Sequence, residues 1–270
     1  MSEPTPVASL PMYDWPEVSD AVDRLWQEIR LRLDKAGLRA PSDLDRRPSY
    51  EEIWSAPGLV LSQTCGYPYV TSLRHKVALV GAPIYDAPGC AGPNYRSMLV
   101  VRRDDPVVSV ADLRGRRAVI NSRDSQSGYS AFRAIVAPFA GGGRFFRSVA
   151  VSGGHRASLR AVAEGRADAA TIDSVCWAMA AWHEPAAYDH LRVLALSPVA
   201  PSLPFITAIR HGPETRALLL GAIGQAIAAD AGYFRKHLLL VGVVSVADEA
   251  YDRIVEIERR AGQLGYADVV

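Results

Sequence analysis

The chain has 270 residues, of which 49% are hydrophobic and 22% are charged. Its 30 basic and 29 acidic residues leave a net charge of +1, which argues against a nucleic-acid-binding surface. No apolar run reaches the length of about 18 residues that a membrane-spanning helix needs. We therefore expect neither binding of nucleic acid nor insertion into a membrane.

The N-terminus and the cysteines each leave two readings open. Residues 1–6 carry neither the basic nor the apolar segment of a secretory signal, so the protein stays in the cytoplasm or has lost an export segment. Cys65, Cys90 and Cys176 show no metal-ligand spacing, so no zinc site is expected. Cys65 and Cys90 lie in Gly- and Pro-containing loops and could form one disulfide, but three unpaired thiols with Cys176 buried fit equally well.

A chain of this length fits two lobes better than one, and its elements alternate between strand and helix. A helix with apolar residues at helical spacing is predicted over 17–36 and ends at Gly37. A helix start follows at 49–52, and a short helical turn is predicted at 109–115. Strands are predicted at 7–13, 59–63, 77–84 and 95–101.

Residues 117–133 form the most informative stretch. Arg117–Ile120 predicts a short buried strand, and Ser125 and Ser127 stand where a helix should begin. A serine there can simply cap the helix. Small hydroxyl residues and glycine also leave the first amide groups accessible at the positive end of the helix dipole, which suits an anion. The stretch therefore predicts an anion-binding loop.

The alternation continues to the end of the chain. A turn at 152–155 leads into a helix that ends at Gly165, and Asp173 stands at the carboxyl end of a strand over 167–173. The remaining predicted strands are 148–151, 191–196 and 205–209, and the remaining helices are 174–182, 214–229 and 248–263.

Such alternation predicts mostly parallel sheets, with ligands bound beyond the carboxyl ends of the strands. The polar or glycine-rich loops that fall at these ends carry Tyr13, Tyr67, Ser125–Ser127, His155 and Asp173. For the two tyrosines the alternative is a core position with a satisfied hydroxyl. For Asp173 it is a helix cap, and for His155 it is a helix cap or a surface position.

Several segments together resemble one family. They are Tyr95–Ser97, Ser109–Arg117, Asn121–Tyr129 with its Asp-Ser-x-Ser-Gly-Tyr core, Cys65–Tyr69, Ser152–Val162 and Gly165–Ser174. In consistent order over roughly residues 7 to 250, they are similar to the phosphate, phosphite and phosphonate substrate-binding proteins of ABC importers. This is the phosphonate-binding branch of the type 2 periplasmic binding proteins.

The resemblance implies an α/β fold of two lobes joined by two crossover strands that act as a hinge. Lobe one would comprise residues 1–97 and 202–270, and lobe two residues 98–201. The ligand would lie in the cleft between the lobes, which would close over it.

The resemblance also implies a set of ligand-binding residues. Ser125, Gln126 and Ser127 would form the oxyanion-binding loop. The remaining contacts would come from Tyr13, Tyr67, Tyr95, Ser97, His155 and Asp173. Gln126 stands where the family commonly has a small hydroxyl residue, so its bulk argues against a full phosphonate as the ligand.

The expected protein is therefore a monomeric, cofactor-free solute-binding protein that delivers a small oxyanion to an ABC permease. The family is periplasmic, whereas the chain as written carries no export signal. The alternative is a cytoplasmic enzyme on the same fold, of lyase or cofactor-biosynthesis type, with His155 as general base and Asp173 as its partner. An effector-sensing module is a third possibility, although no DNA-binding or signalling segment is attached.

Overall fold

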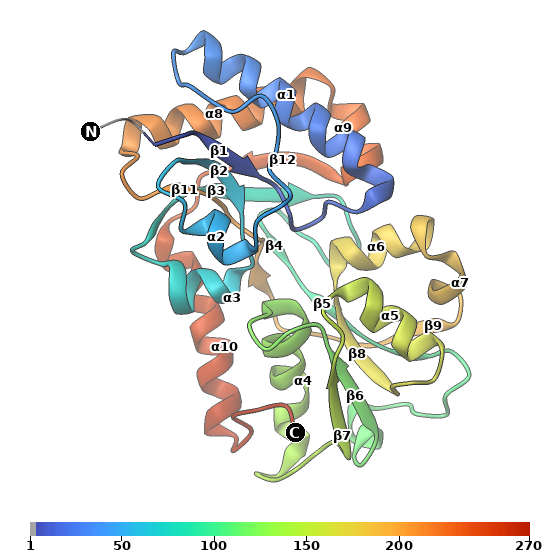
Figure 1. Ribbon diagram of the computed structural model, residues 1–270. Coiled ribbons are helices and arrows are strands. Elements are labelled where there is room, and N and C mark those ends of the chain that lie inside the picture. Colours follow the sequence, from blue (N-terminus) through green and yellow to red (C-terminus); the bar gives the residue numbers. More distant parts are fainter. Residues whose placement is uncertain (1–3) are drawn as a thin grey trace. The chain divides into compact units, whose positions relative to one another are not determined.

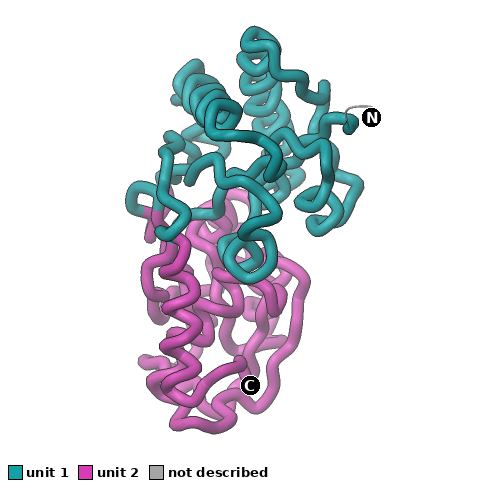
Figure 2. Tube along the Cα trace, turned by 90° about the vertical axis from the view of Figure 1, so that its left-hand side faces the viewer, with its two compact units in different colours: residues 1–86, 91–93, 201–250 teal, residues 87–90, 94–200, 251–270 magenta. Residues whose placement is uncertain are grey.

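The computed structural model describes residues 4–270, which form two compact units (Figure 2). Unit 1 contains the chain up to Asp86 together with residues 91–93 and 201–250, and unit 2 contains residues 87–90, 94–200 and 251–270. Each unit is built from a sheet with helices packed on it. The predicted two-lobed α/β fold is confirmed.

Unit 1 is built on a five-stranded sheet with the strand order β1-β2-β11-β3-β12 (Figure 1). Its strands are β1 (Val7–Ser9), β2 (Leu59–Gln63), β3 (Val77–Tyr85), β11 (Phe205–Ala208) and β12 (Leu240–Val244). Two 17-residue helices, α1 (Ser19–Lys35) and α8 (Pro213–Ala229), pack on each other, and α8 also packs on β3 and β12. The apolar residues of α1 recur every three or four positions, so one face of the helix, including Trp26 and Ile29, is fully buried.

The shorter elements of unit 1 connect these strands and helices. The helix start predicted at residues 49–52 is present, and a capping box formed by Ser49 and Glu52 begins it. The shorter elements are η1 (Pro16–Val18), α2 (Tyr50–Trp54), α3 (Gly66–Pro68), η2 (Tyr69–Leu73) and α9 (Ala231–Leu238), with η5 (Asp248–Tyr251) at the boundary to unit 2.

Unit 2 is built on a second five-stranded sheet with the order β7-β6-β8-β5-β9. Its strands are β5 (Ser97–Arg102), β6 (Arg117–Ile120), β7 (Ser148–Val151), β8 (Ala169–Asp173) and β9 (Leu191–Leu196). Its helical elements are η3 (Val110–Leu113), η4 (Gln126–Ser130), α4 (Ala131–Ala140), α5 (His155–Ala163), α6 (Ser174–His183), α7 (Pro185–Tyr188) and α10 (Asp252–Gln263). A separate two-stranded sheet pairs β4 (Asn94–Tyr95) with β10 (Ala200–Pro201).

Both main sheets are mixed, so the expectation of mostly parallel strands is wrong in this detail. β1 pairs parallel with β2, and β6 pairs parallel with β7 and β8. β11 and β5 run antiparallel to both of their neighbours, and β12 runs antiparallel to β3. β5 and β11 follow the points where the chain passes from one unit to the other. They enter their sheets without a crossover helix, which is the connection that makes neighbouring strands parallel.

The C-terminal helix also differs from its predicted place, because residues 251–270 pack in unit 2 rather than with the N-terminal lobe. α10 packs on α4, and Tyr266 and Val269 belong to the hydrophobic core of unit 2. The amides of Phe145 and Phe146 both donate to the carbonyl of Val270, at 2.8 and 2.9 Å. An amphipathic pattern shows that a helix has a buried face but does not show which sheet covers it.

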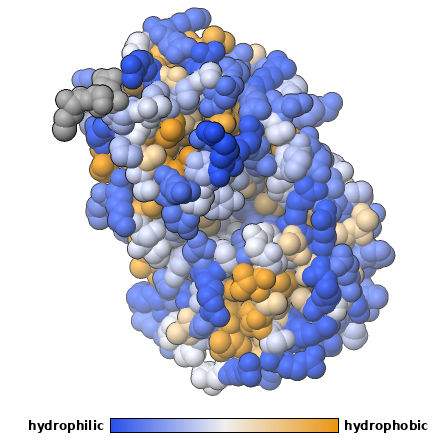
Figure 3. Space-filling view, in the orientation of Figure 1, coloured by the Kyte–Doolittle hydropathy of each residue, from blue (hydrophilic) through white to orange (hydrophobic). Residues whose placement is uncertain are grey.

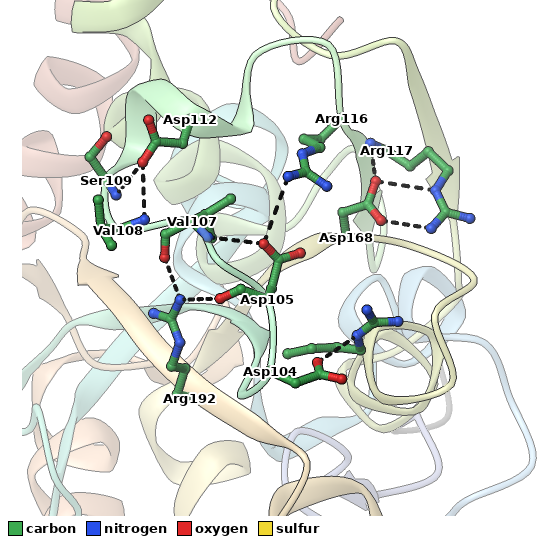
Figure 4. A network of polar contacts seen from close by, with 11 residues as sticks. Asp104, Asp105, Val107, Val108, Ser109, Asp112, Arg116, Arg117, Asp168 and Arg192 are labelled. Atoms are coloured by element: carbon green, nitrogen blue, oxygen red, sulfur yellow. Dashed lines mark hydrogen bonds and ion pairs between the residues drawn. The ribbon is translucent and has the colours of Figure 1, made fainter.

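A network of polar contacts fixes the start of β6 (Figure 4). The Asp168 carboxylate accepts hydrogen bonds from the backbone amide of Arg117 at 2.7 Å and from its guanidinium at 2.6 and 3.1 Å. Burial alone would raise the pKa of Asp168, but these bonds outweigh it and the pKa is lowered. Nearby, Arg192 donates to the Asp105 carbonyl at 3.0 Å. The first residue of β6 is thus held in place. At its other end the strand leads into a loop with four serines, residues 122–130, which we call the serine-rich loop.

Hydrophilic residues cover most of the face drawn in Figure 3, with apolar patches between them. Over residues 4–270, no individual helix has the length and apolar character to cross a membrane, whereas α8 and α9 taken together do, across a 93° bend. The sequence interpretation missed α9 and β12. The apolar run Leu238–Val244, rich in valine, is the signal that predicts β12.

Candidate anion-binding site

The serine-rich loop begins a continuous helical segment in unit 2. η4 is a π-helical turn, and α4 continues it without a break. The Ser125 hydroxyl accepts a hydrogen bond from the Gly128 amide at 3.0 Å, and the Ser125 carbonyl accepts from the Ser130 amide, also at 3.0 Å. Ser125 is therefore a helix cap, as one of the two interpretations predicts. The first amides of any helix lack intrahelical acceptors, and the cap uses only one of them.

Ser127 and His155 come together although they lie on different connections. The Ser127 Oγ and His155 Nε2 atoms are 2.7 Å apart, and the Ser125 and Ser127 Oγ atoms are 3.5 Å apart. Ser127 follows β6, whereas His155 is the first residue of α5 and follows β7. The two strands are parallel neighbours, with Ile120 opposite Val151, so their carboxyl ends lie at one edge of the sheet. The predicted convergence of these two loops is confirmed.

The His155 ring is neutral at pH 7. Burial lowers its pKa to about 4, although a backbone hydrogen bond with Thr171 opposes the shift. A neutral ring adds no positive charge to the site. His155 therefore orients the Ser127 hydroxyl through their hydrogen bond. Only the amide and hydroxyl dipoles of the loop would attract an anion there.

The loop backbone packs closely on its surroundings. A Cβ atom added to Gly128 would lie 1.8 Å from Asn121 Oδ1 and 3.3 Å from His155 Cε1, so only glycine fits there. The Asn121 Oδ1 atom is buried and has no hydrogen-bond partner among residues 4–270. The sequence interpretation did not single out Asn121. Its place directly after β6, beside the glycine of the loop, is the signal that identifies it.

Asp173 serves as the cap of α6. Its carboxylate accepts from the amides of Val175 at 2.8 Å and Cys176 at 3.3 Å, and the residue is 1% exposed. The capping interpretation of Asp173 is thus confirmed. Ser97 lies opposite Asp173 in the β5–β8 register, and its amide donates to Ser197 Oγ at 2.8 Å. Their contact with a ligand stays a prediction.

The three tyrosines named in the predicted site lie in different parts of the fold. Tyr13 belongs to unit 1, and its ring meets the ring of Tyr85 edge to face at a centroid distance of 5.2 Å. Tyr67 also belongs to unit 1 and lies in α3, where its carbonyl accepts from the Thr71 hydroxyl. Tyr95 lies in β4 and is buried. Tyr13 thus fits the alternative of a core aromatic, and the ligand roles of all three stay predictions.

A family model for the phosphonate-type periplasmic substrate-binding proteins of ABC transporters matches residues 61–251. The chain belongs to this family. The match spans the whole serine-rich loop, the turn that carries His155 and the end of β8. The resemblance inferred from the sequence motifs is therefore confirmed.

Solved structures of related fold agree with the family assignment. A binding protein component of an ABC phosphonate transporter from Pseudomonas aeruginosa (PA3383) matches with 17% identity and a TM-score of 0.72, over 97% of this chain and 88% of the other. PhnD1 from Prochlorococcus marinus, in complex with methylphosphonate, matches with 15% identity and a TM-score of 0.71, over 97% and 99%. XAC2383 from Xanthomonas citri, bound to ATP, matches with 14% identity and a TM-score of 0.71, over 97% and 98%. At these identities the likeness shows the fold. No curated protein matches the sequence.

Proposed function

We propose that this substrate-binding protein captures a small oxyanion of the phosphonate or phosphate type at the start of the η4–α4 helix. The observation that carries the proposal is the hydrogen-bonded series Ser125–Ser127–His155 at the start of a helix, where the first amides have no intrahelical acceptors. Two structures of the same fold support the chemistry, since PhnD1 is in complex with methylphosphonate and XAC2383 is bound to ATP, and both molecules carry phosphorus oxyanions.

In this proposal each residue of the loop has a separate task. The amides at the helix start donate to the oxyanion, and the helix dipole favours its charge. Ser127 donates its hydroxyl proton to the ligand while His155 Nε2 holds the serine in place through their hydrogen bond. Gln126, whose side chain is buried, adds an amide donor where relatives commonly carry a hydroxyl. It thereby favours a ligand smaller than a full alkylphosphonate.

We also propose that the ligand leaves chemically unchanged. A serine within hydrogen-bond reach of a histidine is the arrangement of a nucleophile and its base, which is the observation that favours an enzyme. A histidine with a pKa of about 4 is a weak base at pH 7, however, and the Asp173 carboxylate already caps α6. The protein therefore binds the oxyanion and passes it to an ABC permease on the periplasmic side of the membrane, acting as a monomer without a cofactor.

Calorimetric titration with phosphate, phosphite, methylphosphonate and an alkylsulfonate tests the site. We expect saturable binding of at least one phosphorus oxyanion, and loss of it in the S125A/S127A double variant. Each hydrogen bond to a charged group contributes about 1.5–3 kcal/mol, so each serine accounts for about a 10- to 100-fold change in affinity. The matched control is Ser148→Ala, which removes an exposed serine of unit 2 from β7.

Two results would count against the proposal. Undiminished binding in the S125A/S127A variant would place the ligand elsewhere. Conversion of the ligand during a long incubation, seen by mass spectrometry and abolished by His155→Ala, would favour the enzyme. The contributions of Tyr13, Tyr67, Tyr95, Ser97 and Asp173 are tested in the same titration with single variants.

A further inference from the structure

Unit 1 contains a cavity of about 620 Å³ that the proposed function does not use. It lies at the edge of the sheet where β3 begins and where β11 and β12 end, and the first turns of α8 form one of its walls. The loops that carry Tyr13 and Tyr67 follow β1 and β2, and β11 runs antiparallel to β2 with Phe205 opposite Gln63. These loops therefore lie at the other end of the same sheet.

One pair of charges in the cavity wall is already balanced. Arg74 Nε lies 2.9 Å from Asp248 Oδ2, and the Arg74 guanidinium also donates to the Asp248 carbonyl at 2.8 Å. Tyr69 donates its hydroxyl to the same carboxylate. Asp248 is the only acidic residue that lines the cavity among the described residues, and Arg74 neutralises it.

Arg216 differs from Arg74, because no carboxylate from residues 4–270 neutralises it. It lies in the first turns of α8, lines the cavity, and makes no side-chain hydrogen bond or ion pair with any residue from 4 to 270. Its Nε atom is nevertheless buried. A buried donor on a cation without a partner costs free energy unless a ligand or solvent satisfies it. The cavity therefore presents one unbalanced positive charge.

His211 provides the complementary acceptor. The Thr207 hydroxyl has one proton, and its Oγ1 lies 2.7 Å from the Val60 carbonyl, which can only accept. The same Oγ1 lies 2.6 Å from His211 Nδ1, so it must accept the Nδ1 proton. Burial, and secondarily the charge of Arg210, lowers the pKa of His211, so the ring is neutral. The Nε2 atom of this tautomer carries a lone pair and no proton.

We propose that this cavity is a second anion site, for a small oxyanion that also carries a hydroxyl proton, such as the hydrogen phosphate class. The charge of the ligand meets Arg216, and its P–OH or equivalent proton is donated to His211 Nε2. The site lies wholly in unit 1 and is independent of Ser125, Ser127 and His155 in unit 2.

The test uses inorganic phosphate as the probe and the S125A/S127A protein as the background, because that background removes the proposed site in unit 2. Calorimetric titration should show one remaining site, and Arg216→Gln should weaken it about tenfold or more, as expected for a lost charge-assisted hydrogen bond. His211→Phe removes the acceptor and should lower the affinity for phosphate about threefold to tenfold. Sulfate has no proton at neutral pH, so its affinity should be unaffected by His211→Phe.

The matched control is Arg210→Gln, because Arg210 is an exposed arginine beside the cavity that does not line it. Circular dichroism and a thermal melt verify that each variant is folded, which we expect for Arg216→Gln because the side chain has no partner to lose. Absence of phosphate binding in the S125A/S127A background overturns the proposal. An effect of Arg210→Gln equal to that of Arg216→Gln also overturns it, since that result indicates only a general attraction of charge.

Discussion

The neutral His155 ring makes the stability of unit 2 depend on pH. The pKa of His155 is lowered from 6.5 to about 4, so between these values the unfolded chain binds a proton that the folded protein does not. The stabilisation is therefore fully present above about pH 6.5 and is lost progressively as the pH falls towards 4. Between pH 7.5 and pH 5 a shift of this size costs about 2 kcal/mol of the free energy of unfolding.

Urea denaturation of the wild type and of His155→Gln at pH 7.5 and pH 5 measures this cost. Glutamine keeps an amide that can hydrogen-bond to Ser127 but does not titrate, so the free energy of the variant should fall by about 2 kcal/mol less than that of the wild type. The comparison cancels the titration of His211, whose pKa is also lowered, because both proteins contain it. Equal losses in the two proteins would show that His155 does not carry the burial assigned to it.

Three further predictions concern the surroundings of the loop. Asp268→Asn neutralises the carboxylate that accepts a hydrogen bond from the Tyr129 hydroxyl at 2.8 Å, so we expect the free energy of unfolding in urea at pH 7 to fall by about 1–2 kcal/mol. An unchanged midpoint would contradict the role given to the C-terminal segment. Gly128→Ala places a Cβ against Asn121 and should cost about 1–3 kcal/mol and abolish oxyanion binding; wild-type stability would mean that the loop can move aside. Burial raises the pKa of Cys176, so a thiol reagent should label this residue only after unfolding. Rapid labelling of Cys176 itself in the native protein is the opposing result.

Local features of the site could be predicted from the sequence because local rules determine them. The strand Arg117–Ile120 is an apolar run between polar residues, and the structure reproduces its bounds. Ser125 begins a helix because its hydroxyl can accept from an amide three residues on. The meeting of the Ser127 and His155 loops followed from strand–helix alternation, since parallel neighbouring strands end at one edge.

Features that depend on the path of the whole chain could not be predicted in this way. Alternation along the sequence says that β5 and β11 are strands, but their direction in the sheet depends on where the chain enters a unit. The hydroxyl and imidazole groups of Ser127 and His155 could be placed near each other, whereas the burial that neutralises the ring depends on packing from several elements. The family resemblance supplied candidate ligand residues, and for Asp173 the structure shows the cap that the sequence offered as its alternative.

The return of residues 251–270 to unit 2 has a consequence for how the protein folds during synthesis. The amides of Phe145 and Phe146 have no access to their acceptor, the Val270 carbonyl, until that residue has been synthesised. Tyr266 and Val269 likewise fill core positions beside residues that are synthesised much earlier. Unit 1, by contrast, needs nothing beyond residue 250. On the ribosome, where folding proceeds from the N-terminus as residues emerge, unit 1 can therefore finish first. The half of the protein that bears the serine-rich loop stays incomplete until its final helix has been released.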